Sequence, residues 1–92
     1  MKLEIITPET KIFNGEANAV TLPGLEGLFQ ILNNHAPIIS SLSKGEVKVE
    51  VVGQIDQEKL NNKIRVERNT LFIPIKGGVA ELMNNKLIVL AE

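Results

Sequence analysis

Few residues of this sequence could do chemistry, and His35 comes first because it is the only imidazole among 92 residues. Acid–base or nucleophilic catalysis there would need a partner acid or a nucleophile that the fold brings close. A metal site would need several ligands, and a chain with a single histidine and no cysteine offers few of them. We therefore expect His35 to shape a loop or an interface. We predict no catalytic residue, no metal and no cofactor.

The acidic residues and the glycines have similarly simple interpretations. Glycines could cradle a phosphate, but no glycine-rich loop here is followed by Lys-Ser/Thr and a helix, so we expect turn glycines. Glu26 is either a solvated turn carboxylate or a charge that pairs with a basic partner residue. Two carboxylates could together hydrolyse a glycosidic bond. The candidates alternate with apolar residues, however, and are expected to face solvent: Glu4, Glu16, Glu46, Glu50, Asp56 and Glu81.

Length and composition exclude several classes of function. A chain of 92 residues predicts one domain, and its formal charge of −1 gives no electrostatic case for nucleic acid or for an anionic membrane surface. No apolar run approaches the roughly 20 residues that span a bilayer. Without Trp or Tyr, aromatic platforms for bases or sugars are nearly unavailable. The absence of Cys excludes disulfides and fits a reducing compartment.

The elements that must position these residues are strands. Residues 46–51 alternate most cleanly, with three valines on one side and Glu46, Lys48 and Glu50 on the other. We predict turns at Asn14-Gly15, Pro23-Gly24, Asn33-Asn34, residues 43–45 and Asn84-Asn85. No stretch of ten residues has a helical period. The pattern predicts an all-β fold of about eight to ten short, mostly antiparallel strands, in a sandwich or a barrel.

Two features interrupt the regular alternation. Residues 53–69 form a polar break, predicted to be a mobile loop at 53–62 followed by a possible hairpin strand at 63–68. Residues 71–75 and 87–90 are apolar on both faces. Such a strand is either covered on both sides or presents one outer face to a partner.

The most specific stretch runs from residue 22 to residue 39, with Leu-Pro-Gly-Leu-Glu-Gly at its start and His-Ala-Pro-Ile-Ile at its end. It resembles the signature of the ε subunit of the rotary F-type ATP synthase. The opening Leu-x-Ile-x-Thr-Pro and the closing Gly-Gly and Val-Leu-Ala segments are similar to that family too, so the resemblance covers nearly the whole chain outside 53–69. Two departures are Gln30, where the family usually has Gly, and Asn33-Asn34, which replace a common Pro-Gly.

The resemblance implies a single flattened β-sandwich over residues 1–92 and a non-catalytic rotor subunit of the central stalk. Its implied partners are the γ subunit and the membrane c ring, with the α/β head reached through the complex. It would couple proton or sodium flow to ATP synthesis at the cytoplasmic face of the bacterial plasma membrane, touching the membrane only through the ring. The residues facing γ are not identified. The implied ring-facing residues are Gly24, Leu25, Glu26, Gly27, Asn33, Asn34, His35, Ala36, Pro37 and Ile38.

Family members commonly continue into a helical hairpin that inhibits ATP hydrolysis. This chain has no such residues after Glu92, so we expect neither that inhibition nor ATP sensing from it. The alternative is an unrelated β-sandwich that binds a ligand or peptide. That alternative explains the strands but not the combined Pro-Gly-x-Glu-Gly and His-Ala-Pro pattern. A small hydrolase is a third class, and no nucleophile–base constellation supports it.

Overall fold

The computed structural model describes residues 1–55, 60 and 63–92, and these contain nine strands and no helix. The predicted all-β fold of eight to ten strands is therefore confirmed. The carboxylate candidate Asp56 and most of the predicted mobile loop lie outside the described residues. The strands are β1 (Lys2–Ile6), β2 (Lys11–Gly24), β3 (Gly27–Leu32), β4 (Ile38–Leu42), β5 (Gly45–Val51), β6 (Arg65–Glu67), β7 (Thr70–Ile75), β8 (Gly78–Met83) and β9 (Lys86–Ala91).

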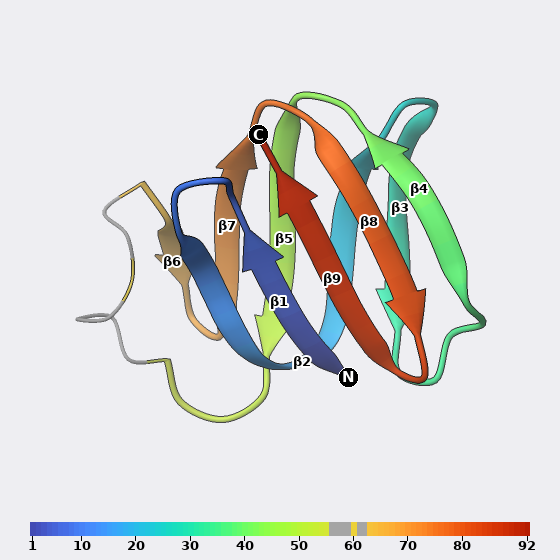
Figure 1. Ribbon diagram of the computed structural model, residues 1–92. Coiled ribbons are helices and arrows are strands. Elements are labelled where there is room, and N and C mark those ends of the chain that lie inside the picture. Colours follow the sequence, from blue (N-terminus) through green and yellow to red (C-terminus); the bar gives the residue numbers. More distant parts are fainter. Residues whose placement is uncertain (56–59, 61–62) are drawn as a thin grey trace.

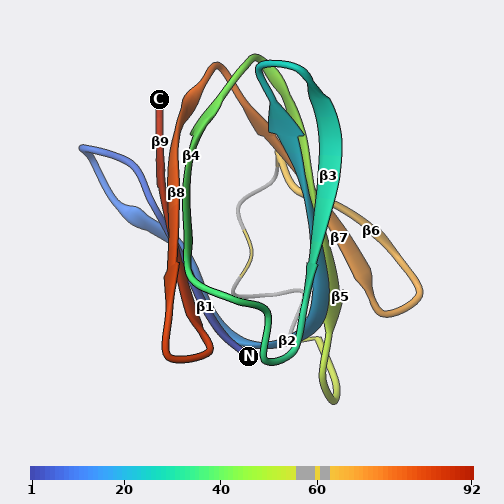
Figure 2. The same cartoon turned by 90° about the vertical axis from the view of Figure 1, so that its right-hand side faces the viewer.

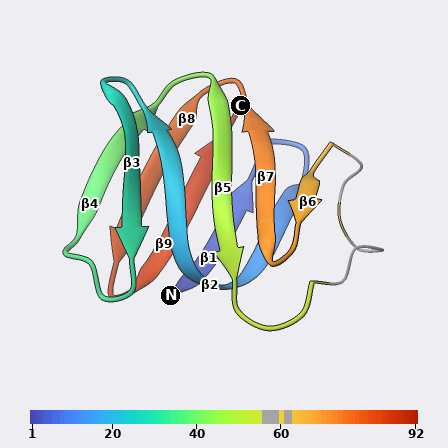
Figure 3. The same ribbon diagram turned by 180° about the vertical axis from the view of Figure 1, so that it is seen from behind.

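The strands form two packed layers, seen edge-on in Figure 2. One layer is β1-β9-β8-β4, which is in front in Figure 1, and the other is β3-β2-β5-β7-β6, which is in front in Figure 3. Strand β2 is long enough to serve both, because its first part pairs with β1 and its second part with β5 and β3. The β1–β9 pair is parallel and all the other pairs are antiparallel, as the mostly antiparallel prediction required.

The core lies between the two layers and is aliphatic. The valines of β5 are buried at 47, 49 and 51 while the charged residues between them are exposed, which confirms the alternation read from the sequence. Every side chain that is fully buried among the described residues is apolar. Such a core has no polar group to satisfy, so its stability rests on apolar burial and close packing. The domain measures 31 × 26 × 22 Å.

Two predicted turns are wrong. Asn14-Gly15 lies inside β2, opposite Glu4 and Leu3 of β1, and the reversal between β1 and β2 falls instead at Thr7–Thr10, closed by a Thr7 N–H to Thr10 O bond of 2.8 Å. A methyl group at Gly15 would lie 3.0 Å from the Phe13 ring, so this glycine leaves room for a ring. The turn signal was outweighed by the ladder with β1, which is a tertiary effect.

Pro23-Gly24 is the second wrong turn. Both residues stay in the ladder with β3, and the reversal follows at Leu25-Glu26. A Cβ at Gly24 would lie 2.9 Å from the carbonyl oxygen of Gly27, so glycine is needed there for close approach across the hairpin. The Pro23 carbonyl accepts a 2.8 Å hydrogen bond from Ser43 N–H, which ties this end of the hairpin to the chain after β4.

Other predicted reversals are confirmed. Asn34, Asn84 and Asn85 all have positive φ, at 62°, 51° and 58°. Asparagine tolerates this region better than most residues, and two such residues in succession make the tight turn between β8 and β9. The predicted strand near 63–68 is β6, which pairs with β7. Because β6 begins at Arg65, opposite Phe72, its pairing with β7 does not reach Pro74. Pro74 therefore lies on an edge where its missing N–H costs no hydrogen bond.

Candidate functional site

The residues predicted to face a ring lie in two segments at opposite ends of β3. The turn at Leu25-Glu26 precedes β3, and residues 33–37 join β3 to β4. A strand of six residues spans roughly 20 Å at about 3.3 Å per residue, so the two segments are not brought together at one point. What connects them is the edge of the sandwich made by β3 and β4, which faces the viewer in Figure 2.

The end of this edge at the β2–β3 turn is hollowed and carries both apolar and polar groups. Leu25 and Leu28 are 69% and 75% exposed, and Glu26 is an exposed carboxylate between them. An open hollow of about 530 Å³ lies between the turn and β4. Its lining is Gly24, Leu25, Glu26, Gly27, Leu28, Phe29, Ile39, Ser40 and Ser41. A shallow hollow that combines exposed leucines with a carboxylate and two serines suits contact with a protein loop.

The other end carries His35, which is exposed. Its Nδ1 lies 2.7 Å from the Ala36 carbonyl oxygen, and its backbone N–H donates to Leu32 O at 3.2 Å. Within residues 1–55, 60 and 63–92, no group of three or more His, Cys, Asp or Glu side chains could hold a metal. His35 is therefore an exposed loop residue whose ring is accessible to a partner.

Ile38 and Ile39 divide between the core and the surface. Ile38 is half-buried and packs against the core, whereas Ile39 is 73% exposed. Of the two, Ile39 is therefore the side chain that a partner could reach, although the sequence prediction named Ile38. The alternation of β4 explains the difference, because neighbouring residues of a strand face opposite sides.

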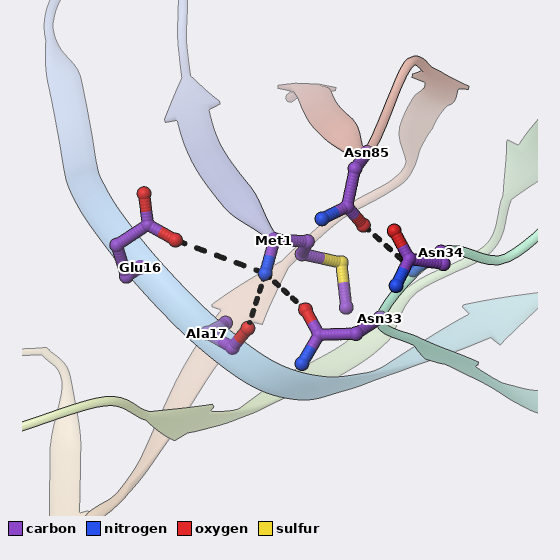
Figure 4. A network of polar contacts seen from close by, with 6 residues as sticks. All are labelled: Met1, Glu16, Ala17, Asn33, Asn34 and Asn85. Atoms are coloured by element: carbon purple, nitrogen blue, oxygen red, sulfur yellow. Dashed lines mark hydrogen bonds and ion pairs between the residues drawn. The ribbon is translucent and has the colours of Figure 1, made fainter.

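A network of polar contacts holds the start of the β3–β4 connection, and sequence reasoning missed it (Figure 4). The α-ammonium of Met1 donates to the Asn33 side-chain oxygen and, at 2.8 Å, to the Ala17 carbonyl. The Asn34 N–H donates to the Asn85 side-chain oxygen at 2.7 Å. These partners are 32 and 51 residues apart in sequence, so no local pattern could have revealed them.

The outer faces of the two sheets differ in character. On the β1-β9-β8-β4 layer the outward apolar residues form what we call the apolar face. In the strand pairing, Leu90 of β9 lies opposite both Val79 of β8 and Ile6 of β1. Glu81 of β8 lies opposite both Ile39 of β4 and Ile88 of β9. Four of the apolar residues are large and exposed, and two are half-buried. The members are Ile6, Ile39, Val79, Met83, Ile88 and Leu90.

The opposite outer face is charged and internally paired. Arg65 lies 3.8 Å from Glu46 and from Glu67, and its guanidinium sits 4.2 Å above the Phe72 ring. Of the two stretches predicted to be apolar on both sides, 71–75 is thus partly covered by Arg65. The stretch 87–90 leaves Leu90 56% exposed. The apolar face is thus uncovered, with the exposed Glu81 lying among its members, and such a face is typical of a docking surface.

The remaining candidates have structural positions. Glu4 lies 3.9 Å from Lys11, and the other described carboxylates of the set are exposed on strands. Gly77 and Gly78 form the corner between β7 and β8, with φ of 152° and 148°. A Cβ at Gly78 would lie 2.2 Å from the Leu90 carbonyl oxygen, so this corner admits only glycine.

Taken together, the fold and these surfaces define a β-sandwich domain with one largely apolar sheet face and one edge of exposed loops. The whole chain, residues 1–92, matches the family described as ATP synthase, delta/epsilon chain, β-sandwich domain. The chain therefore belongs to the ATP synthase delta/epsilon chain family. This is a non-catalytic subunit of the synthase, so the prediction that the chain is not itself an enzyme is confirmed.

Individual relatives carry the name ATP synthase epsilon chain. The one from Chlorobium limicola is 36% identical over 91 residues, covering 99% of this chain and 88% of the relative. The one from Chlorobaculum tepidum is 37% identical over 90 residues, covering 98% and 86%. That from Herminiimonas arsenicoxydans is 33% identical over 92 residues, and the chain spans 56% of its length.

A solved structure shares the fold. A chain in the central stalk and c ring structure of the Tetrahymena thermophila mitochondrial ATP synthase superposes with a TM-score of 0.75 at 15% identity. The match covers 99% of this chain and 62% of that one. Among the described residues, no helix is long and apolar enough to cross a membrane.

Proposed function

We propose that this chain is a rotor subunit that joins the γ subunit to the c ring of an ion-driven ATP synthase. The observation that carries the proposal is the pairing of one uncovered apolar sheet face with one edge of exposed loops on a domain of the ε family. Two separate surfaces are what a connecting subunit needs. The complex would lie at the cytoplasmic face of a bacterial plasma membrane, with the domain reaching the membrane through the ring and the α/β head through γ.

The apolar face is the proposed γ surface. Ile39, Met83 and Leu90 are each more than half exposed, and burying such side chains contributes about 1.5–3 kcal/mol apiece when the burial is complete. The charged face, by contrast, would lose solvation at Glu46 and Arg65 without new partners. A stable partner is therefore better placed on the apolar side.

The β3–β4 edge is the proposed ring surface. The turn at Leu25-Glu26 and the segment 33–37 can contact one flat surface only if β3 lies along it, because they are at opposite ends of that strand. Leu28 and Leu32 are exposed on β3 between the two. Short polar loops of a ring would meet apolar side chains along the strand, a carboxylate at Glu26 and the imidazole of His35.

The sandwich suits the transmission of torque. Close-packed interiors deform little, so a load applied at one surface is passed to the other. The described core is continuous and wholly apolar, and β2 runs through both layers. Family membership excludes the alternative of an unrelated β-sandwich module.

Co-expression with the γ subunit of the same organism tests the proposal. Size-exclusion chromatography should give a 1:1 complex. The complex should be lost on Leu90→Asp, with Val52→Asp as the matched control, because Leu90 and Val52 are 56% and 48% exposed and Val52 lies outside the apolar face. Separate peaks for the two unmodified proteins at high concentration would contradict the γ assignment.

A further inference from the structure

Strand β3 lies at an open edge of its layer, because among the strands of the described residues it pairs with β2 alone. Proteins usually protect such edges with charge, with proline or by keeping the strand short. Strand β6, at the other end of the layer, is three residues long and contains Arg65 and Glu67. Strand β3 is six residues long and contains neither a charged residue nor a proline. Its edge, which faces the viewer in Figure 2, is therefore open to pairing with a further strand.

The backbone groups on this edge come from Leu28, Gln30 and Leu32. In an antiparallel ladder, residue pairs that exchange two hydrogen bonds alternate with pairs that exchange none. Leu28 lies opposite Pro23, which has no N–H and whose carbonyl accepts from Ser43 instead, so this pair is of the second kind. By alternation, the N–H and C=O groups at positions 28, 30 and 32 point away from β2.

We propose that β3 pairs antiparallel with β3 of a second copy of this chain, about a two-fold axis at Gln30. The side chains at 28, 30 and 32 are Leu, Gln and Leu, an order that is the same in both directions. The axis therefore sets Leu28 of one copy against Leu32 of the other, and on the opposite face Phe29 against Ile31. Leu28 and Leu32 are 75% and 54% exposed, so the pairing would cover apolar surface on both copies.

The polar groups match in the same arrangement. The outward N–H groups of one copy would meet the outward carbonyls of the other, and the Leu32 carbonyl, which accepts from His35 N–H at 3.2 Å, has a second lone pair. Glu26 is the one charged residue in the stretch 25–37. The two copies of Glu26 would be eight positions apart along the ladder, roughly 26 Å, which is well beyond the range of screened repulsion. Each would instead lie near Asn33-Asn34 of the other copy, whose side-chain amides are donors.

Strand β4 also lies at this edge and has no charge, but it suits a second copy less well. A two-fold axis at Ser40 would set Ile39 against Ser41, which places an apolar side chain against a hydroxyl. Pro37, directly before the strand, has no N–H to offer a partner. The self-complementary strand of this edge is thus β3.

The pairing has a consequence that rests on the proposed function, because β3 is the strand proposed to lie along the c ring. A second copy on β3 would cover the turn at Leu25-Glu26 and the segment 33–37, so the dimer could not dock on a ring. The chain would pair with itself when unassembled and exchange that contact for the ring on assembly. A single pair of strands makes a small interface, so we expect a dissociation constant on the order of 100 µM.

Sedimentation equilibrium of the chain measures the pairing over a range from about 10 µM to about 1 mM, which brackets a weak contact of this size. Gln30→Lys would set two ammonium groups against each other at the axis and should weaken association at least tenfold. Gln54→Lys is the matched control, since Gln54 is exposed and lies outside β3, and it should associate as the unmodified chain does. A chain that stays monomeric throughout the range would overturn the proposal. So would association that survives Gln30→Lys but is lost on Leu90→Asp, which would place the contact on the apolar face.

A single cysteine tests the register, because the chain has none of its own. The Cα atoms of a hydrogen-bonded antiparallel pair are about 5.5 Å apart, within the range of a disulfide. Gln30→Cys should therefore give a disulfide-linked dimer under mild oxidation. Thr21→Cys is the control, since Thr21 lies opposite Gln30 on β2 and its two copies would be three strand spacings, roughly 14 Å, apart. Equal cross-linking of the two variants would overturn the two-fold axis at Gln30.

Binding to purified c rings separates this inference from the proposed function. The reduced Gln30→Cys chain should bind rings, and the oxidised dimer should not. Equal binding by the two forms would overturn the claim that pairing covers the ring surface. Failure of the unmodified chain to bind rings would contradict the proposed function instead, whereas the sedimentation and cross-linking results would still decide whether β3 pairs with itself.

Discussion

Leu90→Asp should weaken γ docking about a hundredfold while leaving the fold intact. Leu90 is 56% exposed on β9, between Val79 and Ile6 in the register of the apolar face. Full burial of a leucine contributes about 1.5–3 kcal/mol, so burying the exposed half contributes roughly 1–1.5 kcal/mol. A carboxylate placed there would also lose its water without gaining a partner, at a cost of about 1–3 kcal/mol or more.

The two contributions sum to roughly 3 kcal/mol, which corresponds to an affinity for γ about a hundredfold weaker. Isothermal titration calorimetry with purified γ measures this change, and thermal unfolding of the isolated variant should stay close to that of the unmodified domain. Val52→Asp is the control, since it makes the same exchange of an exposed aliphatic residue outside the apolar face. Affinity within about threefold of the unmodified domain for Leu90→Asp would refute the placement of γ.

Three further predictions follow from the same contacts. Leu25→Asp and His35→Ala, at opposite ends of β3, should each weaken binding to purified c rings by about 1–2 kcal/mol without lowering Tm, because both side chains are exposed; loss from one end only would show that β3 does not lie along the ring. Gly78→Ala should destabilise the domain by about 2 kcal/mol or more in urea unfolding, given the φ of 148° and the Leu90 carbonyl 2.2 Å from the new Cβ; an unchanged midpoint would contradict that crowding. Leu22→Ala should cost about 2–5 kcal/mol in the same assay, because Leu22 is fully buried in the core; a cost under about 1 kcal/mol would mean that the core there is loosely packed.

Much of the fold could be predicted from local pattern. Alternation at β5 placed its valines inside, because the two-residue period of a strand fixes which side chains share a face. The same rule separated Ile31, which is buried, from Leu28 and Leu32, which are exposed. Asparagine pairs marked two reversals through their tolerance of positive φ.

The errors came from strand pairing that the composition of a turn does not reveal. Asn14-Gly15 has the composition of a hairpin turn, yet β1 holds it in an extended ladder. Pro23-Gly24 stays in the ladder because its partners come from β3. The site was predicted in part. Its two loops were recognised by their motif. That they lie a full length of β3 apart was not predicted, because this distance depends on where the turns fall. The brace between Met1 and Asn33 joins residues 32 apart, which local sequence does not encode.

The most direct test of the account is a bridging assay with purified γ, purified c rings and this chain. Rings immobilised in detergent should retain γ only when the chain is added, and retention should fall with Leu90→Asp on the γ side and with Leu25→Asp on the ring side. Retention of γ that is independent of the chain, or that survives both substitutions, would contradict the claim that this domain connects the two.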